Sequence, residues 1–319
     1  MKRPQTGLFT EFIKAVEPQL RTPFVERHQG SKLTSVLEGV FDMMSKRKKD
    51  EIILSLDQDE EEHYTLRTCM SDQSFIVDTT RLLVESFGGH WEAGFNVVLR
   101  VKRGRDCLLT GFGADESPLE SILQIEIDNI SEDQMPAFEA NLRRNLELAR
   151  AMVLDFEEMT SELERAAEQF HRASGRDAEN SERFKEAEGF IDWLLADNFV
   201  FMGLISSAGK FGFESESCNE IWGAEPQSVW PDAAWGDFPV RARKSHKASP
   251  VHRNGQIDEI RILVPTPSGS SELLVRGMFT YRAITQPSRH VPILRTLLST
   301  VLIEDHSLPG SWRYKGIAN

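Results

Sequence analysis

Two histidines and one cysteine come nearest to a metal-binding pattern in this sequence. His246 and His252 lie an even number of positions apart, so on one continuous strand both side chains would point to the same face. Imidazole nitrogen and thiolate sulfur are common ligands of Zn²⁺, and Cys218 precedes the pair, but no carboxylate or further cysteine completes the set nearby. One hypothesis is a hydrolytic or metal-dependent enzyme that uses these three residues. The other is a pair of surface histidines that bind no metal.

A phosphate-binding loop is the second kind of site to consider. Dinucleotide sites use G-x-G-x-x-G between a strand and a helix, because backbone amides must approach the pyrophosphate at the helix N-terminus. The nearest match runs from Gly111 to Glu116 (GFGADE); it lacks the third glycine, and no apolar helix pattern follows it. We interpret this segment as a polar loop between two strands and predict no cofactor-binding residue in this chain.

The three cysteines, Cys69, Cys107 and Cys218, are far apart and form no C-x-x-C pair. This usage fits reduced thiols in the cytoplasm better than a disulfide framework. We expect Cys69 on a strand whose outer face is polar and the other two in loops. No flanking pattern marks any of them as an activated nucleophile, so we predict no catalytic residue and no metal ligand.

The net charge of −13, from 37 basic and 50 acidic side chains, argues against binding to nucleic acid or to an anionic membrane surface. One basic run, Lys46 to Lys49, is followed at once by acidic residues, and we interpret it as a solvated helix end. The N-terminus lacks the apolar stretch of a secretory signal, and no segment reaches the roughly 18 apolar residues of a spanning helix. We therefore expect a cytoplasmic protein.

The elements that would position any site follow from the hydrophobic pattern. Residues 8 to about 56 have apolar residues at helical spacing, and the pattern changes to strand alternation near residue 61. The clearest strand has Leu123, Ile125 and Ile127 on one face and polar residues on the other, which we expect to face solvent. Helical spacing without Gly or Pro then runs from Ala137 to Ser174, which predicts a continuous helix about 50 Å long.

Each predicted strand has one apolar side, so the economical arrangement is a small antiparallel sheet with helices on one face. We predict an α+β protein with tandem ACT-like or ferredoxin-like sheets joined by a long helical hairpin. The expected domains are an N-terminal helical segment at 1–58, a first ACT-like domain at 59–156, a helical hairpin or linker at 157–197 and a second ACT-like domain at 198–319. Whether the strand near Phe201 belongs to the first or the second sheet stays open.

Five segments, in order and in register, resemble the N-terminal half of the large bacterial NAD-specific glutamate dehydrogenases. The family patterns are D-x-P-F-L-V-D-S, V-L-R-V with I-E-I-D, F-L-x-W-L-x-D-x-N-F-x-F-L-G, S-x-V-H-R, and L-F-T with I-P-L-L-R. The matching segments here are Asp72 to Asp78 (DQSFIVD), Val98 to Val101 with Ile125 to Asp128, Phe190 to Gly203, Ser249 to Arg253, and Met278 to Thr280 with Val291 to Arg295. This chain departs from the family at Gln73-Ser74, where Met-Pro is usual, at Tyr281 to Ala283, and at Trp312-Arg313.

The resemblance implies ACT-like domains in a chain whose NAD-binding and catalytic domains come much later. We therefore expect a fragment of a longer polypeptide that acts as a regulatory or oligomerisation segment of an NAD-dependent glutamate dehydrogenase and is inactive alone. The alternative is a stand-alone ACT-like amino-acid-binding regulatory protein. Expected partners are the remaining domains of the same polypeptide, further copies of the chain and an amino-acid effector. ACT-type effectors bind at the turn after the first strand, where helix amides can hold a carboxylate, which here means Asp72, Gln73 and Ser74.

Overall fold

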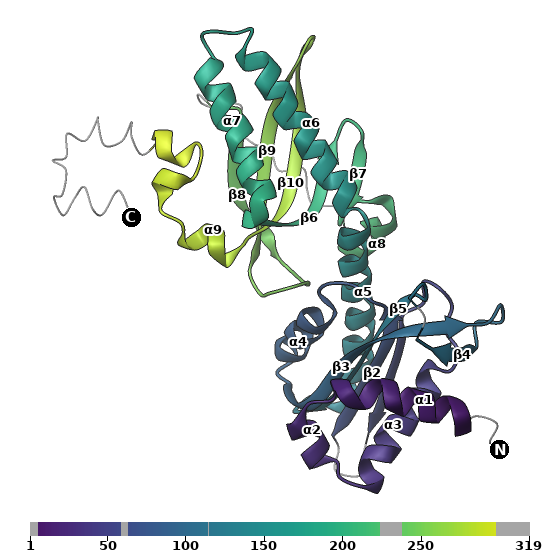
Figure 1. The fold of residues 1–319 in the computed structure, drawn as a ribbon. Helices are drawn as coiled ribbons and strands as arrows, with labels where there is room; N and C mark the ends of the chain where they lie inside the picture. Colours follow the sequence, from purple (N-terminus) through teal and green to yellow (C-terminus); the bar gives the residue numbers. More distant parts are fainter. Residues whose placement is uncertain (1–5, 59–62, 114, 224–237, 298–319) are drawn as a thin grey trace. The chain divides into compact units, whose positions relative to one another are not determined.

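The computed structural model describes residues 6–58, 63–113, 115–223 and 238–297. The chain divides into two compact units (Figure 1). The first comprises Met1–Glu147 with Pro250–Arg253, and the second comprises Leu148–Ser249 with Asn254–Asn319. Each unit contains one antiparallel five-stranded sheet, which confirms the tandem α+β prediction.

The first sheet has the strand order β1-β2-β5-β3-β4, and all neighbouring strands are antiparallel. Its strands are β1 (Ile53–Gln58), β2 (Tyr64–Ser71), β3 (His90–Arg103), β4 (Leu109–Phe112) and β5 (Leu119–Asp128). The sequence β2, helix, β3, β5 and helix, with β5 between β2 and β3, gives the sheet its ferredoxin-like centre. β1 occupies the last six residues of the N-terminal segment 1–58, which was expected to be helical. That expectation was therefore wrong for these residues.

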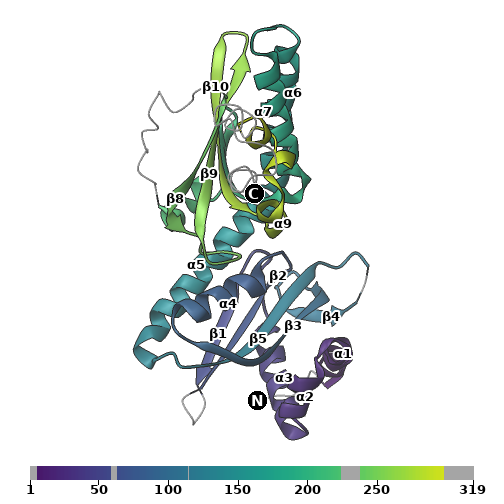
Figure 2. The same ribbon diagram turned by 90° about the vertical axis from the view of Figure 1, so that its left-hand side faces the viewer.

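Helices cover both faces of the first sheet (Figure 2). α4 (Ile76–Ser86) and the first part of α5 (Met135–Leu154) pack on one face through residues such as Leu83 and Phe138. α1 (Thr6–Val16), α2 (Thr22–Arg27) and α3 (Ser31–Met44) pack on the other through residues such as Phe12 and Phe41. The N-terminal helices are therefore part of the first unit and add a layer beyond the one-face arrangement expected from the strand pattern.

The polar face of β5 does not face solvent, and this expectation was wrong. Glu120 and Gln124 are 2% and 1% exposed, because α1–α3 cover the face on which they lie. The Arg67 guanidinium donates to the Gln124 side-chain oxygen at 2.9 Å. Strand alternation correctly predicted which residues share a face, but it did not show that the N-terminal helices cover the polar one.

The long helical pattern is divided at Asp155 into α5 and α6 (Phe156–Ser174). Asp155 has φ −91° and ψ 8°, and its carboxylate accepts a hydrogen bond from the Gly212 amide at 2.7 Å. The expected continuous helix was therefore wrong at one residue. The break is not marked by Gly or Pro and comes with a contact to a segment more than 50 residues away.

The second sheet has the order β7-β6-β10-β9-β8. Its strands are β6 (Phe199–Ser206), β7 (Gly209–Gly212), β8 (Val240–Ala248), β9 (Gln256–Thr266) and β10 (Gly269–Phe279). α6 and α7 (Ser181–Trp193) pack side by side on one face of this sheet, and α8 (Asn219–Trp222) and α9 (Tyr281–Thr285) are two further short helices of this unit. The strand near Phe201 is β6 and therefore belongs to the second sheet.

The boundaries of the two units differ from the expected domain limits, since contacts group the N-terminal helices with the first sheet and α6 and α7 with the second. Among the described helices, none is both long and apolar enough to cross a bilayer.

Candidate functional site

The turn that connects β2 to α4 carries the three predicted effector-binding residues, Asp72, Gln73 and Ser74. It is fixed at one end by the Asp72 amide, which donates to the Leu119 carbonyl at 3.0 Å. At the other end Phe75 has φ +72° and precedes the helix, so the chain turns sharply before the first free amides of α4. The structure thus brings the three residues together at a helix N-terminus.

Two polar groups in this turn are unusual for a solvated loop. The Gln73 side-chain nitrogen is buried and has no hydrogen-bond partner among the described residues. Desolvation raises the pKa of the Asp72 carboxyl above its ordinary value, although a hydrogen bond from the Gln73 amide acts in the opposite direction. A buried donor without a partner is a feature that a polar ligand could satisfy.

The upward shift in the pKa of Asp72 can be tested by comparison with Asp177, an aspartate whose pKa is shifted downward. Hydrogen bonds from the side chain and the backbone of Asn180 hold the pKa of Asp177 below its ordinary value. We expect a ¹³C NMR titration of the carboxyl carbons to show Asp72 taking up its proton at a higher pH than Asp177. The opposite order would contradict the placement of the Asp72 carboxyl in this turn.

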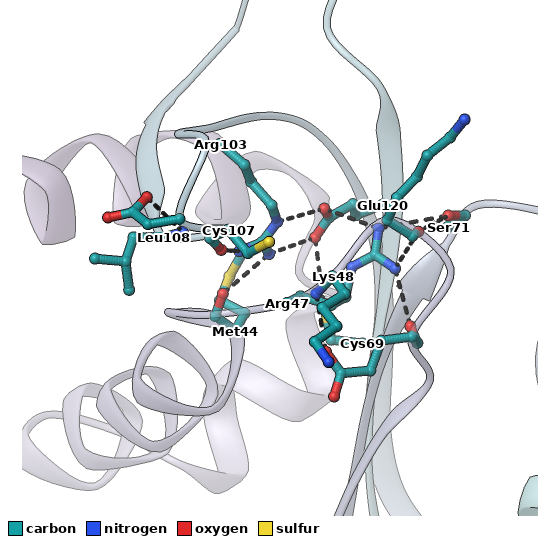
Figure 3. Close-up of polar contacts among 12 residues, drawn as sticks. Met44, Arg47, Lys48, Cys69, Ser71, Arg103, Cys107, Leu108 and Glu120 are labelled. Carbon is teal, nitrogen blue, oxygen red and sulfur yellow. Dashed lines mark hydrogen bonds and ion pairs between the residues drawn. The ribbon is translucent and has the colours of Figure 1, made fainter.

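A buried polar cluster of the first unit surrounds Glu120, at the start of β5 (Figure 3). Arg47 approaches one carboxylate oxygen at 3.0 Å, and Arg103 bonds both oxygens at 2.7 and 2.8 Å. The same guanidinium of Arg103 donates to the Met44 carbonyl at the end of α3, at 3.0 Å. The cluster therefore connects the N-terminal helices to two strands of the sheet. Because each charge has a partner, removal of any one of these groups would leave a buried charge uncompensated.

Cys69 and Cys107 lie next to this cluster, and Cys69 does not have the environment of a nucleophile. Cys69 is fully buried, and its thiol donates to Glu120 at 3.4 Å. Burial is the largest cause of the strongly raised pKa of this thiol, and the negative charge of Glu120 adds to it. The thiol therefore stays protonated at neutral pH. Cys69 lies on a strand, as expected, but the face that we expected to be the polar outer face of this strand is covered by the N-terminal helices. The backbone carbonyl of Cys107 accepts a hydrogen bond from Arg103.

Sequence reasoning missed this cluster for an identifiable reason. Arg47 stands in the basic run Lys46 to Lys49, which we interpreted as solvated, yet Arg47 is 3% exposed while Lys48 and Lys49 are exposed. The available signal was Glu120, an acidic residue in strand register with Ile122 on the same face. An acidic residue in line with core residues requires a buried cation or a covering layer.

The glycine-containing segment is part of the sheet and not a phosphate loop. Gly111 and Phe112 lie in β4, paired with β3, and the Phe112 side chain packs against the N-terminal helices. The next described regular element is β5, a strand, so no helix N-terminus follows the glycines. The interpretation as a loop between two strands was wrong for Gly111 and Phe112, which lie in β4, whereas Gly113, Asp115 and Glu116 lie between β4 and β5.

The His246, His252 and Cys218 hypothesis has no geometric support. His246 lies in β8, but β8 ends at Ala248, and His252 falls in the following turn with φ +71°. The two histidines are therefore not at strand spacing on one face. Cys218 is buried in a short 3₁₀ turn. Within the ranges that the structure describes, no group of three His, Cys, Asp or Glu side chains is placed to hold a metal ion.

Comparison with known proteins agrees with the fold. Residues 20–142 match the model of the family described as glutamate dehydrogenase, ACT1 domain. The chain is also 27% identical over 270 residues to the NAD-specific glutamate dehydrogenase of Halomonas elongata, a match that covers 75% of this chain and 16% of that protein. The chain thus spans a small part of the length of this relative. The chain is therefore similar to an NAD-specific glutamate dehydrogenase over most of its own length, and residues 20–142 carry the similarity to the ACT1 domain.

Proposed function

We propose that this chain is a regulatory and assembly segment of an NAD-dependent glutamate dehydrogenase. The observation that carries the proposal is the extent of the match to the Halomonas elongata enzyme, which covers 75% of the chain. Neither unit alone contains that share of the chain, so the similarity extends over residues of both. A relationship confined to one ACT-like sheet would be compatible with many regulatory proteins, whereas one that extends over both units supports this enzyme.

In this proposal the complete polypeptide oxidatively deaminates L-glutamate to 2-oxoglutarate in the cytoplasm, and its other domains bind NAD and carry the catalytic residues. The present segment contributes contacts to those domains and to further copies of the chain. An amino-acid effector at Asp72, Gln73 and Ser74 would act through α4, whose N-terminus faces this turn. Helix amides that hold the effector carboxylate would couple its binding to the position of the helix.

The size of the native polypeptide tests the proposal most directly. An immunoblot of the source cells with an antibody against this segment is expected to show a band several times heavier than 36.2 kDa. Immunoprecipitation with the same antibody should recover activity that reduces NAD in the presence of L-glutamate. The matched control is a precipitation with antibody that has been preabsorbed with the purified segment.

A band at 36 kDa together with no recovered activity would overturn the proposal. The stand-alone amino-acid-binding protein would then be the better interpretation. A heavy band without glutamate-dependent activity would retain the longer polypeptide but contradict the assignment to this enzyme.

A further inference from the structure

Two surfaces of the second unit expose large apolar side chains. The first lies at the junction of α5 and α6, where Leu154 is 69% and Phe156 is 49% exposed. The second lies on α9, where Tyr281 is 82% and Ile284 is 63% exposed. A single exposed apolar residue is ordinary on a protein surface, whereas apolar residues that are grouped beside charges are typical of a surface that binds a partner.

The junction patch comprises Leu154, Phe156, Glu157 and Glu158. It lies where the helical pattern breaks at Asp155, whose carboxylate accepts a hydrogen bond from the Gly212 amide at 2.7 Å. This contact fixes the break between the helices and with it the exposed position of the two apolar side chains. Carboxylates are common in the first turn of a helix, so the apolar pair beside them is the feature that requires an explanation.

The α9 patch comprises Tyr281, Arg282, Ile284 and Arg289. α9 is anchored by Ala283, which is buried and whose amide donates to the Thr280 hydroxyl at 3.3 Å. Residues three apart lie on the same face of a helix, so Tyr281 and Ile284 project together from the side that the anchor leaves exposed. The two side chains therefore form one apolar surface.

The charges of the two patches are opposite. Among the described residues, the carboxylates of Glu157 and Glu158 make no hydrogen bond or ion pair. In the α9 patch Arg289 likewise has no partner among them, and Arg282 makes one long bond to a backbone carbonyl, at 3.5 Å. The sequence has no acidic residue between positions 280 and 297. An apolar surface with a positive rim is complementary to an apolar surface with a negative one.

A single molecule does not bring its own two patches together. Figure 1 shows α9 and the start of α6 on different sides of the second unit. Two copies related by a two-fold axis can place the junction patch of each against the α9 patch of the other, because an isologous interface forms every contact twice. This arrangement covers both apolar surfaces and gives each set of charges its counterpart.

We propose that two copies of this chain associate through the second unit, with the junction patch of one bound to the α9 patch of the other. A partner of different sequence would have to supply both complementary surfaces, whereas a second copy already carries them. Tyr281 to Ala283 is a segment at which the chain departs from the family pattern, so the resemblance alone does not imply this contact. The inference rests on the proposed function only in taking contacts between copies as part of the role of this segment.

Sedimentation equilibrium of the whole chain tests the interface. We expect the native chain to show twice the mass of 36.2 kDa at micromolar concentrations. One variant reverses the junction patch with Glu157→Lys and Glu158→Lys, and a second reverses the α9 patch with Arg282→Glu and Arg289→Glu. Each should associate at least about tenfold more weakly than the native chain, because like charges would then face each other.

A mixture of the two variants is the decisive measurement. In a mixed dimer the two reversed patches face each other and so do the two unchanged patches, and both contacts regain opposite charges. The mixture should therefore dimerise as tightly as the native chain, although each variant alone does not. The matched control carries Arg176→Glu and Glu179→Lys, which are exposed residues beyond the far end of α6, and it should associate like the native chain.

Ile284→Ser gives a readout that does not depend on charge. The side chain is 63% exposed in the single chain, so its loss should leave the fold intact and weaken association about tenfold. Circular dichroism confirms that each variant is folded.

Three results would overturn the proposal. The first is a native chain that stays monomeric, and the second is association that reversal of either patch leaves unchanged, which would assign the contact to another surface such as a sheet edge. The third is a mixture of the two reversed variants that associates no better than either alone. None of these results bears on the size of the native polypeptide, so this proposal and the dehydrogenase proposal fail separately.

Discussion

Replacement of Glu120 with glutamine should lower the free energy of unfolding of the first unit by about 3–5 kcal/mol. The carboxylate is 2% exposed and lies between two guanidinium groups, of which Arg47 is 3% exposed. Without the negative charge, two cations remain close together and largely removed from water. Breaking a buried pair by removing one partner costs far more than the pair itself contributes, because desolvated charge is left uncompensated.

The measurement is guanidinium unfolding followed by ¹⁹F NMR of protein labelled with 5-fluorotryptophan. Trp91 lies in β3 and reports on the first unit, whereas Trp193 and Trp222 report on the second. Glu85→Gln, an exposed glutamate on α4, is the matched control and should change the stability by less than about 0.5 kcal/mol. A Glu120→Gln effect no larger than that of Glu85→Gln would contradict a stabilising role for the cluster.

The pH dependence gives the same cluster a second readout. Burial alone would raise the pKa of Glu120, but hydrogen bonds from Arg103 and Arg47 outweigh it and hold the pKa below the ordinary value of 4.5. Because the pKa of Glu120 is lower in the folded chain than in the unfolded chain, the ionised carboxylate contributes its full stabilisation above pH 4.5. This contribution is lost as the pH falls through the pKa of Glu120 in the folded chain. The difference in stability between the native chain and Glu120→Gln should therefore shrink in acid.

Replacement of Gly277 with alanine should lower the free energy of unfolding of the second unit by about 3 kcal/mol. A Cβ atom at this position would overlap the Val200 carbonyl oxygen and the Phe199 ring. Gly277 also lies where the register between β10 and β6 shifts. The backbone of β6 would have to move away from the centre of the sheet to accommodate a methyl group, which would weaken the pairing of the two strands.

The Trp193 resonance reports this change, because the Trp193 ring packs against Phe279 at the end of β10. Gly175→Ala is the matched control. A Cβ atom there meets no heavy atom closer than 3.9 Å, and the residue has φ −79°. We expect Gly175→Ala to stay within about 0.5 kcal/mol of the native chain. Equal stability of the two variants would contradict the close approach of β10 and β6 at Gly277.

The sequence predicted elements well where a single periodicity ran without interruption. The alternation of Leu123, Ile125 and Ile127 with polar residues correctly identified a strand and the apolar face that receives α4 and α5. What lay on the other face could not be read from that strand. The answer depends on three short helices about 100 residues earlier, whose apolar sides cover the polar residues of β5.

The candidate sites show the same limit. Asp72, Gln73 and Ser74 are adjacent in the chain, so their common location in a turn could be predicted from local signals alone. By contrast, Arg27 and Lys32 line one groove of the first unit together with Asp128, about 100 residues later in the chain, and only the packing of α2 and α3 on the sheet brings them together. Local patterns also failed at Asp155, where the interruption of a strong helical repeat accompanies a distant hydrogen bond.

The helices on both faces of the first sheet restrict how this unit can join a second subunit. Sheets stack face to face only where each offers an apolar face that no helix occupies, and in the part of the chain that the structure describes the first sheet has none. Its two outermost strands, β1 and β4, keep backbone groups that pair with no further strand of this sheet. Without displacement of a helix layer, an oligomer can extend this sheet only sideways, strand beside strand, through one of these edges.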